Sequence, residues 1–206
     1  MARALPGHAL PQGEACLDPA RLFRPGVARL ALEVGFGGGE HLAALARANP
    51  DWGFLGCEPY LNGVAQLLVK IEEARLDNIR IQRGDAREVI ERLPASSLDA
   101  VYVLFPDPWP KRRHWKRRFV APETLHGLSR VMREGAELRI ATDSGAYAQW
   151  TLEKVLGRPG FTWLASRPDD WRRRPEGSPE TRYEAKARHA GRAIYHLRFQ
   201  KAQAGP

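Results

Sequence analysis

A single carboxylate beside a dense run of positive charge is the most chemically suggestive feature of this chain. Asp107 lies between Pro106 and Pro108, and six of the eight residues in Lys111–Arg118 are lysine or arginine. The prolines exclude a continuing strand and an immediate helix, so a rigid loop is expected. Basic side chains interleaved with aromatic ones suit phosphate contacts and base stacking, which favours RNA binding. The alternative is a solvated charged face.

A glycine-rich turn over residues 33–40 predicts a second site. Gly35 and Gly37 let the backbone turn tightly and approach a ligand closely. Glu33 precedes the turn, and Glu40 occupies a position that is glycine in a dinucleotide-binding fingerprint. Two carboxylates there would repel a pyrophosphate, whereas they suit a ligand that carries an ammonium and a sulfonium. The turn therefore favours S-adenosylmethionine over NAD.

Two further acidic residues follow the next two apolar runs. Glu58 is placed like the acid that accepts hydrogen bonds from ribose hydroxyls in nucleotide-binding α/β sheets. Asp85 is placed to accept a hydrogen bond from an adenine amino group. The alternative is that these acids cap the helices that follow the strands. Their recurrence after successive runs favours a ligand site.

Short apolar runs alternate with segments of helical period through most of the chain. Strands are expected at 30–34, 52–58, 78–82, 98–105, 136–142, 161–165 and 192–199, and helices at 39–48, 60–75, 86–92, 121–133 and about 144–157. Strands separated by crossover helices are typical of a doubly wound, mostly parallel α/β sheet, here seven-stranded. Because ligands bind outside the carboxyl ends of such strands, the acidic residues and the proline loop should meet.

Length, charge and cysteine content limit the remaining possibilities. A chain of 206 residues suits one domain, residues 29–206, preceded by an irregular segment, 1–28, that is either a mobile tail or a strap on the domain. The net charge of +8 favours a polyanionic partner. No apolar run approaches the ~20 residues of a membrane span, and the N-terminus lacks a signal-peptide core, which predicts a cytoplasmic protein. Cys16, Cys57 and the scattered histidines predict neither a disulfide framework nor a metal site.

Taken in order, these motifs resemble those of the bacterial tRNA (guanine-N7-)-methyltransferase family. The resemblance spans about residues 30 to 200, and its most specific part is the Pro-Asp-Pro-Trp loop followed by lysine and a His-x-Lys-Arg-Arg cluster. The matching segments are Leu32–Gly39, Gly56–Glu58, Phe105–Lys111, Arg113–Arg118, Ala141–Asp143 and Thr181–Glu184. The first 28 residues match poorly.

The resemblance implies a class I methyltransferase fold of Rossmann-like type. It implies transfer of a methyl group from S-adenosylmethionine to N7 of the guanine at position 46, in the tRNA variable loop. By the same resemblance, Asp107 is both close to the donor and catalytic. The residues implied to bind the donor are Glu33, Glu58, Asp85 and Asp107, with Gly35 and Gly37 in the turn, and those implied to contact the substrate are Lys111, Asp143, Thr181, Arg182, Tyr183 and Glu184.

The chemistry of guanine N7 suggests how Asp107 acts. N7 has a free lone pair and no proton at neutral pH, so no base is needed to expose it. The reaction must align N7 with the methyl group and tolerate the positive charge that moves onto the purine. We therefore assign Asp107 to orientation and electrostatic stabilisation, with proton abstraction as the weaker alternative.

Several residues keep two interpretations at this stage. Asp143 and Glu184 are candidate acceptors for the Watson–Crick edge of guanine, and Lys111 or Arg182 could donate to O6. Asp143 could equally cap a helix that begins near Ser144, and Thr181–Glu184 could be a capping box. The residues expected to bind tRNA phosphates are Arg113, His114, Lys116, Arg117 and Arg118. Trp171–Arg174 is either a second RNA contact or a solvated loop.

Two other classes of function compete with tRNA methylation. One is an RNA-binding module that keeps the fold without turnover, and the other is a methyltransferase that acts on a small molecule. The acids around the glycine turn argue against the first, and the polycation at Lys111–Arg118 argues against the second. The sequence is compatible with a monomer or a homodimer.

Overall fold

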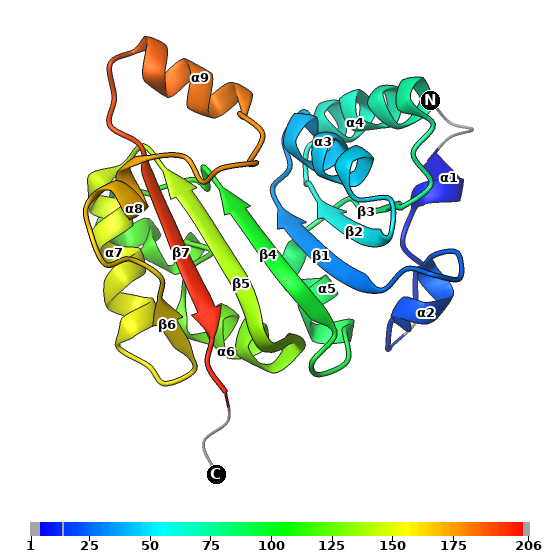
Figure 1. The fold of residues 1–206 in the computed structure, drawn as a ribbon, viewed down its shortest axis with the longest axis horizontal. Coiled ribbons are helices and arrows are strands. Elements are labelled where there is room, and N and C mark those ends of the chain that lie inside the picture. The colour runs from blue at the N-terminus through cyan, green and yellow to red at the C-terminus, as the bar shows by residue number, and fades with distance from the viewer. Residues whose placement is uncertain (1–4, 14, 204–206) are drawn as a thin grey trace.

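Seven strands form one sheet in the order β3-β2-β1-β4-β5-β7-β6 (Figure 1). The computed structural model describes residues 5–13 and 15–203. The strands are β1 (Arg29–Val34), β2 (Trp52–Cys57), β3 (Ile79–Gln82), β4 (Leu98–Leu104), β5 (Met132–Thr142), β6 (Phe161–Trp163) and β7 (Tyr195–Lys201). The first five pair in parallel, whereas β7 runs antiparallel to both β5 and β6. The expected mostly parallel, doubly wound sheet is confirmed.

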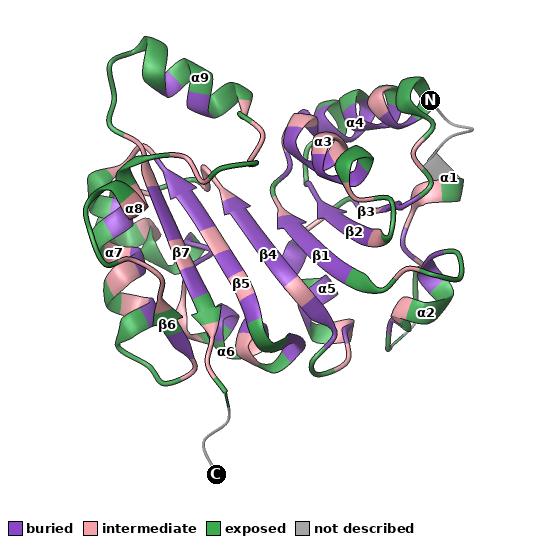
Figure 2. Cartoon of the chain, viewed as in Figure 1, coloured by how far each residue is buried: buried purple, intermediate pink, exposed green. Residues whose placement is uncertain are grey.

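Helices cover both faces of this sheet. They are α1 (Leu5–His8), α2 (Pro19–Leu22), α3 (Glu40–Ala48), α4 (Leu61–Ala74), α5 (Ala86–Arg92), α6 (Pro122–Val131), α7 (Gly145–Leu156), α8 (Asp169–Arg172) and α9 (Arg182–His189), with a 3₁₀ helix, η1 (Arg112–Arg117). Successive side chains of β1 enter different cores: Leu30 and Leu32 pack with α5, α6 and α7, and Ala31 packs with α3 and α4. This alternation buries the sheet on both faces, as Figure 2 shows.

Several elements differ from the sequence-based expectation. The helix expected to reach residue 133 ends at Val131, and β5 begins at once, because Met132 pairs with Leu98. Residues 112–117 wind into η1 instead of a plain loop. The unexpected helix α9 begins after Thr181, whose hydroxyl accepts a hydrogen bond from Glu184 N at 3.0 Å. The capping signal at Thr181 was present in the sequence, but the following residues have little apolar periodicity.

The segment before β1 lies along the domain as a strap. Leu10 N donates to Ile81 O at 2.9 Å, and Leu17 N donates to Arg92 O at 2.9 Å. Leu10 and Leu17 are buried with the core that α5 and α6 share. Residues 1–4 and 14 lie outside the described residues, and the division of the chain at residue 28 stays a prediction.

Two findings bear on membrane and metal binding within the described part of the chain. There, no helix is long and apolar enough to cross a membrane. The same residues contain no group of three or more histidine, cysteine, aspartate or glutamate side chains placed to hold a metal ion. Cys16 is exposed and Cys57 is buried, and both are free thiols.

Replacing a strap leucine tests whether the strap belongs to the core. Leu17→Ala should lower the free energy of unfolding by about 2–5 kcal/mol, because Leu17 is fully buried and the change leaves a cavity. Urea unfolding measures this difference. Leu156→Ala is the matched control, since Leu156 is 47% exposed, and should change the free energy by no more than about 0.5 kcal/mol. Equal values for the two variants would show that the strap adds nothing to the core.

Candidate active site

A cleft of about 530 Å³ opens at the carboxyl ends of the parallel strands. The glycine turn after β1, Glu58 after β2, Asp85 after β3 and Asp107 after β4 all line it. In the sheet, β2 and β3 are added on one side of β1, and β4 and β5 are added on the other side, so the strand order reverses next to β1. Such a switch point is the usual ligand site of an open α/β sheet.

Glu58 organises the glycine turn. One carboxylate oxygen, Oε2, accepts a hydrogen bond from Gly37 N at 2.8 Å, and Oε1 accepts one from Tyr60 N at 3.0 Å. Gly37 has a φ of 56°, a conformation that favours glycine. A Cβ at Gly63, in the first turn of α4, would lie only 2.3 Å from Gly37 O. The turn is therefore packed tightly against α4, while a Cβ at Gly35 would meet nothing within 4 Å.

Glu33 lies behind the turn and is not part of the cleft lining. Its Oε2 is 2.8 Å from His41 Nδ1, and both side chains are buried. Glu33 therefore does not reach the surface of the cleft, and its role in binding the donor stays a prediction. The reason is that α3 places His41 over Glu33, a pairing between residues eight positions apart that the sequence analysis missed.

Asp85 caps a helix and also lines the cleft. Its Oδ1 accepts a hydrogen bond from Arg87 N at 2.9 Å, which caps α5, and its Oδ2 lies 2.6 Å from Arg87 Nη1. The carboxylate also lines the cleft. Asp85 is thus a helix cap whose charge faces the ligand space.

The loop that carries Asp107 has a strained backbone at both ends. Phe105 has a φ of 52° and Trp109 a φ of 41°, and bulky residues rarely adopt this conformation. Phe105 N donates to Ala141 O at 2.7 Å, which ties the start of the loop to β5. Asp107 is exposed and lines the cleft. The loop therefore presents its carboxylate to the ligand space from a fixed backbone.

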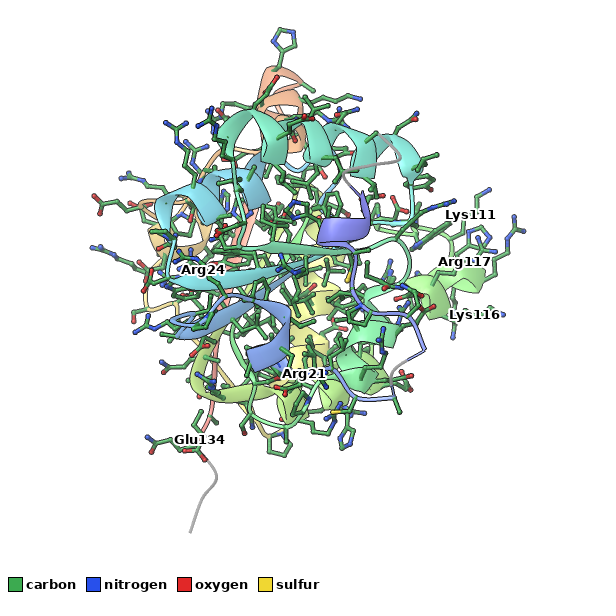
Figure 3. The ribbon with its side chains drawn as sticks, turned by 90° about the vertical axis from the view of Figure 1, so that its right-hand side faces the viewer. Arg21, Arg24, Lys111, Lys116, Arg117 and Glu134 are labelled. Carbon is green, nitrogen blue, oxygen red and sulfur yellow. The ribbon has the colours of Figure 1, made fainter. Side chains whose placement is uncertain are left out.

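The basic residues of η1 form a projecting surface beside this loop. Lys111, Lys116 and Arg117 extend together from one edge of the molecule (Figure 3). Arg113 is also exposed, and His114 packs edge-on against Trp109 with ring centroids 5.6 Å apart. The Arg117 guanidinium lies 4.9 Å from the centroid of the Trp109 ring and lines the cleft. Arg117 thus connects the basic surface with the ligand space.

Arg118 corrects the sequence analysis, which assigned it to RNA phosphates. The residue is only 3% exposed, and its Nε donates to Pro108 O at 2.9 Å. The guanidinium lies 4.8 Å from the centroid of the Trp115 ring and 4.6 Å from that of Trp150. A side chain enclosed in this way does not reach a phosphate. A run of like charges in a sequence does not reveal which member turns inward.

The opposite rim of the cleft is formed by the start of α9. Arg182 and Tyr183 line the cleft, and the Tyr183 ring stacks on Phe105 with centroids 6.4 Å apart. A Cβ at Gly37 would come within 3.2 Å of the Tyr183 ring. Tyr183 therefore contacts both the Asp107 loop and the glycine turn. The Thr181 side chain caps α9 and does not line this cleft.

Glu184 lies apart from the main cleft. It is buried, and its Oε1 is 3.1 Å from Arg188 Nη2 and 3.5 Å from Arg174 Nη1. Its carboxylate lines a separate cavity of about 30 Å³, too small for a purine, together with His196. Burial raises the pKa of Glu184. Reading a guanine edge with Glu184, as the sequence suggested, would therefore require this cluster to open.

Two other predicted substrate residues lie outside the cleft lining. Asp143 pairs with Arg192, with Oδ2 and Nε 2.8 Å apart. The cap of α7 is Ser144, whose Oγ accepts a hydrogen bond from Tyr147 N, so the capping interpretation of Asp143 is wrong. Lys111 is exposed at the start of η1.

Trp171–Arg174 also differs from a free RNA-contact loop. Residues 169–172 form α8, and the Trp171 ring stacks on Tyr195 with centroids 6.0 Å apart. Arg174 turns toward Glu184. Only Arg172 and Arg173 of the three arginines are exposed.

Comparison with known proteins gives the family. A family model described as putative methyltransferase matches residues 28–197. A tRNA (guanine-N(7)-)-methyltransferase of Rhodospirillum rubrum is 48% identical over 97% of this chain and 78% of its own length. One of Azorhizobium caulinodans is 45% identical over 98% of this chain and 87% of its own. The chain belongs to the tRNA (guanine-N(7)-)-methyltransferase family.

Solved structures with a similar fold support the fold assignment. A 16S rRNA methyltransferase superposes with a TM-score of 0.64 at 20% identity, covering 87% of this chain and 91% of the other. A SAM-dependent O-methyltransferase of Thermotoga maritima gives 0.56 at 15% identity, covering 86% and 61%. The expected class I methyltransferase fold is confirmed.

The pH dependence of stability tests the buried cluster under α9. Burial, with smaller contributions from Arg174 and Arg188, lowers the pKa of His196 from its ordinary 6.5 to about 4, although Glu184 lies 3.8 Å away. As the pH falls, His196 is therefore protonated near pH 6.5 in the unfolded chain but only near pH 4 in the folded chain. The stabilising contribution is complete above pH 6.5 and is lost as the pH falls toward 4.

His196→Gln should remove this part of the pH dependence. Between pH 7.5 and 4.5 the variant should lose about 1–3 kcal/mol less unfolding free energy than the unchanged protein. His126→Gln, at an exposed site on α6, should behave like the unchanged protein. Urea unfolding at both pH values gives the comparison, and identical losses in all three proteins would refute the placement of His196.

Proposed function

We propose that this protein transfers the methyl group of S-adenosylmethionine to N7 of the guanine at position 46 in the tRNA variable loop. The observation that carries the proposal is the meeting of two surfaces at residues 105–118. Asp107 and Arg117 both line the cleft, and Arg117 also belongs to the projecting basic surface. Family membership supports the same reaction.

The cleft suits the methyl donor in size and charge. A volume of about 530 Å³ is within the usual range for cofactor sites. Gly35 and Gly37 allow close approach of the donor, Glu58 has lone pairs left for ribose hydroxyls, and Asp85 is placed for the adenine amino group. Glu33 contributes negative charge from behind the turn. When bound, S-adenosylmethionine supplies an electrophilic methyl group on a sulfonium.

Asp107 acts on charge and orientation in this proposal. Guanine N7 attacks with its own lone pair, so the enzyme need not remove a proton from it. Positive charge then accumulates on the purine, and the Asp107 carboxylate stabilises it from a backbone that is already fixed. Arg182 and Tyr183, which line the cleft at its rim, are the proposed contacts of the target nucleotide. Lys111, Asp143, Thr181 and Glu184 join them as proposed substrate contacts, the last two after rearrangement of α9.

The basic surface holds the tRNA backbone. Lys116 and Arg117 project into solvent and carry the largest share of the proposed phosphate contacts, with Arg113 and His114 beside them. The protein would act in the cytoplasm, as a monomer or a homodimer. Both alternatives, an RNA-binding module without turnover and a small-molecule methyltransferase, lack one of the two surfaces that meet at this cleft.

A methylation assay distinguishes the three functions. Unmodified tRNA is incubated with labelled S-adenosylmethionine, and nuclease digestion reveals the labelled nucleoside. N7-methylguanosine is the expected product, and a tRNA with adenine at position 46 should remain unlabelled. Folded protein that binds the donor and yields no N7-methylguanosine would rule out the proposed reaction.

Removing the charge of Asp107 should abolish most of the turnover. Asp107→Asn keeps the shape of the side chain, yet kcat should fall by about 100-fold or more, because the electrostatic partner of the methylated purine is lost. Binding of tRNA, measured by filter retention, should be unchanged. Asp51→Asn removes an exposed carboxylate just before β2, at the other end of the strands, and should keep full activity. Near-normal turnover in Asp107→Asn would contradict the assignment.

Neutralising η1 should change the salt dependence of tRNA binding. Lys116→Gln with Arg117→Gln should weaken binding and reduce the slope of log K against log salt by about 2, one for each lost phosphate contact. The control pairs Arg47→Gln with Arg75→Gln, which removes the same charge from exposed residues near the ends of α3 and α4. Equal slopes for the two double variants would mean that η1 is a solvated face.

A further inference from the structure

Arg118 makes its hydrogen bonds to the loop that carries Asp107. Its Nε donates to Pro108 O at 2.9 Å, and its Nη2 donates to Trp109 O at 3.3 Å. These carbonyls belong to the two residues that follow Asp107, and the second residue has the positive φ of 41°. One guanidinium therefore fixes the part of the loop that follows Asp107, including the strained residue Trp109.

The guanidinium is itself held in place by aromatic rings. It lies 4.6 Å from the centroid of the Trp150 ring, 4.8 Å from that of Trp115 and 5.6 Å from that of Tyr147. Trp150 Nε1 donates to Val120 O at 2.7 Å, and Val120 N donates to the Tyr147 hydroxyl at 3.4 Å. The rings from α7 are thus anchored to the backbone just after Arg118, so the side chain has little freedom to move.

A second arginine connects this arrangement to the donor side of the cleft. Arg87 Nη2 donates to Arg118 O at 3.2 Å, while its Nη1 lies 2.6 Å from Asp85 Oδ2. Arg87 Nε also donates to Thr124 Oγ1 at 3.3 Å, which fixes it against α6. A continuous series of contacts therefore runs from Asp85 through Arg87 and Arg118 to the residues beside Asp107.

We propose that Arg118 is a positioning residue for methyl transfer, which holds Asp107 against the donor cleft through the carbonyls of Pro108 and Trp109. The inference rests on the proposed function and deepens it, because it divides the basic cluster between two tasks. Lys116 and Arg117 bind tRNA from the outside, and Arg118 sets the geometry of the reaction from the inside. A loss of position of about 1 Å at a reacting group can cost about 100-fold in rate.

The kinetic test compares neighbouring arginines of opposite exposure. Arg118→Lys keeps the charge but loses the two-carbonyl geometry of the guanidinium, so kcat should fall by about 10-fold to 100-fold, with KM for tRNA within about 2-fold. Arg117→Gln should give the opposite split, with a raised KM for tRNA and a smaller change in kcat. A raised KM with unchanged kcat in Arg118→Lys would make Arg118 an RNA ligand and overturn the proposal.

Amide hydrogen exchange tests the same proposal without any turnover. In Arg118→Lys and Arg118→Gln, exchange at the hydrogen-bonded loop amides of Phe105 and His114 should rise by about 10-fold or more, while exchange in β1 and β4 stays unchanged. A rise throughout the chain, or failure of both variants to fold, would give Arg118 a merely structural role and overturn the proposal. This measurement needs no tRNA. If the unsubstituted protein proved inactive, the proposed function would fail, but hydrogen exchange would still test whether Arg118 holds the loop.

Discussion

The parallel pairing of β3, β2, β1 and β4 is the constraint on which the site depends. Parallel strands end at the same edge of a sheet, so residues that follow different strands are brought together although they lie far apart in the sequence. Glu58, Asp85 and Asp107 reach one cleft for this reason. The antiparallel β7 begins at this same edge, because its first residue, Tyr195, pairs with Thr142 at the end of β5, and α9 directly precedes it. Arg182 and Tyr183, at the start of α9, therefore line the same cleft as the acidic residues.

The Asp107 loop shows how a strained backbone is maintained at this edge. A positive φ at bulky residues such as Phe105 and Trp109 costs about 1–3 kcal/mol each. A hydrogen bond that involves a charged group contributes about 1.5–3 kcal/mol, and Arg118 makes two of them to the loop. These magnitudes are comparable, so the guanidinium offsets the strain. Cation–π contacts with the rings around Arg118 help to offset the conformational entropy that is lost when this side chain is ordered.

The fold and the cleft were largely predictable from the sequence, because both follow from local signals. Apolar runs alternating with helical segments gave the strands, and the glycine turn and the acids after successive strands marked the donor side. The sequence did not reveal the partners that distant segments supply to several of the predicted site residues. Glu33 is covered by His41, and Asp143 pairs with Arg192. Glu184 lies between Arg174, in the segment between α8 and α9, and Arg188 of α9. Those pairings depend on packing that no periodicity records.

Arg118 is the most instructive of these residues, because its burial contradicts the predicted contact with RNA phosphates. In the sequence it is one of six basic residues in a row of eight, with nothing to separate it from its neighbours. In the fold it follows η1 and turns inward, where its guanidinium lies among the rings of Trp115 from η1 and of Tyr147 and Trp150 from α7. The basic cluster is therefore not a uniform binding surface. Its exposed members form the surface, and the buried Arg118 holds the neighbouring loop.

The central claim is that residues 105–118 join methyl transfer to tRNA binding, and a structure of the complex tests it most directly. The crystal structure would contain this chain, S-adenosylhomocysteine and unmodified tRNA. The account predicts that guanine N7 faces the donor sulfur beside Asp107. Phosphates of the same tRNA should lie against Lys116 and Arg117, while Arg118 keeps its hydrogen bonds to the loop. A complex in which η1 points into solvent, or in which another base atom faces the sulfur, would contradict it.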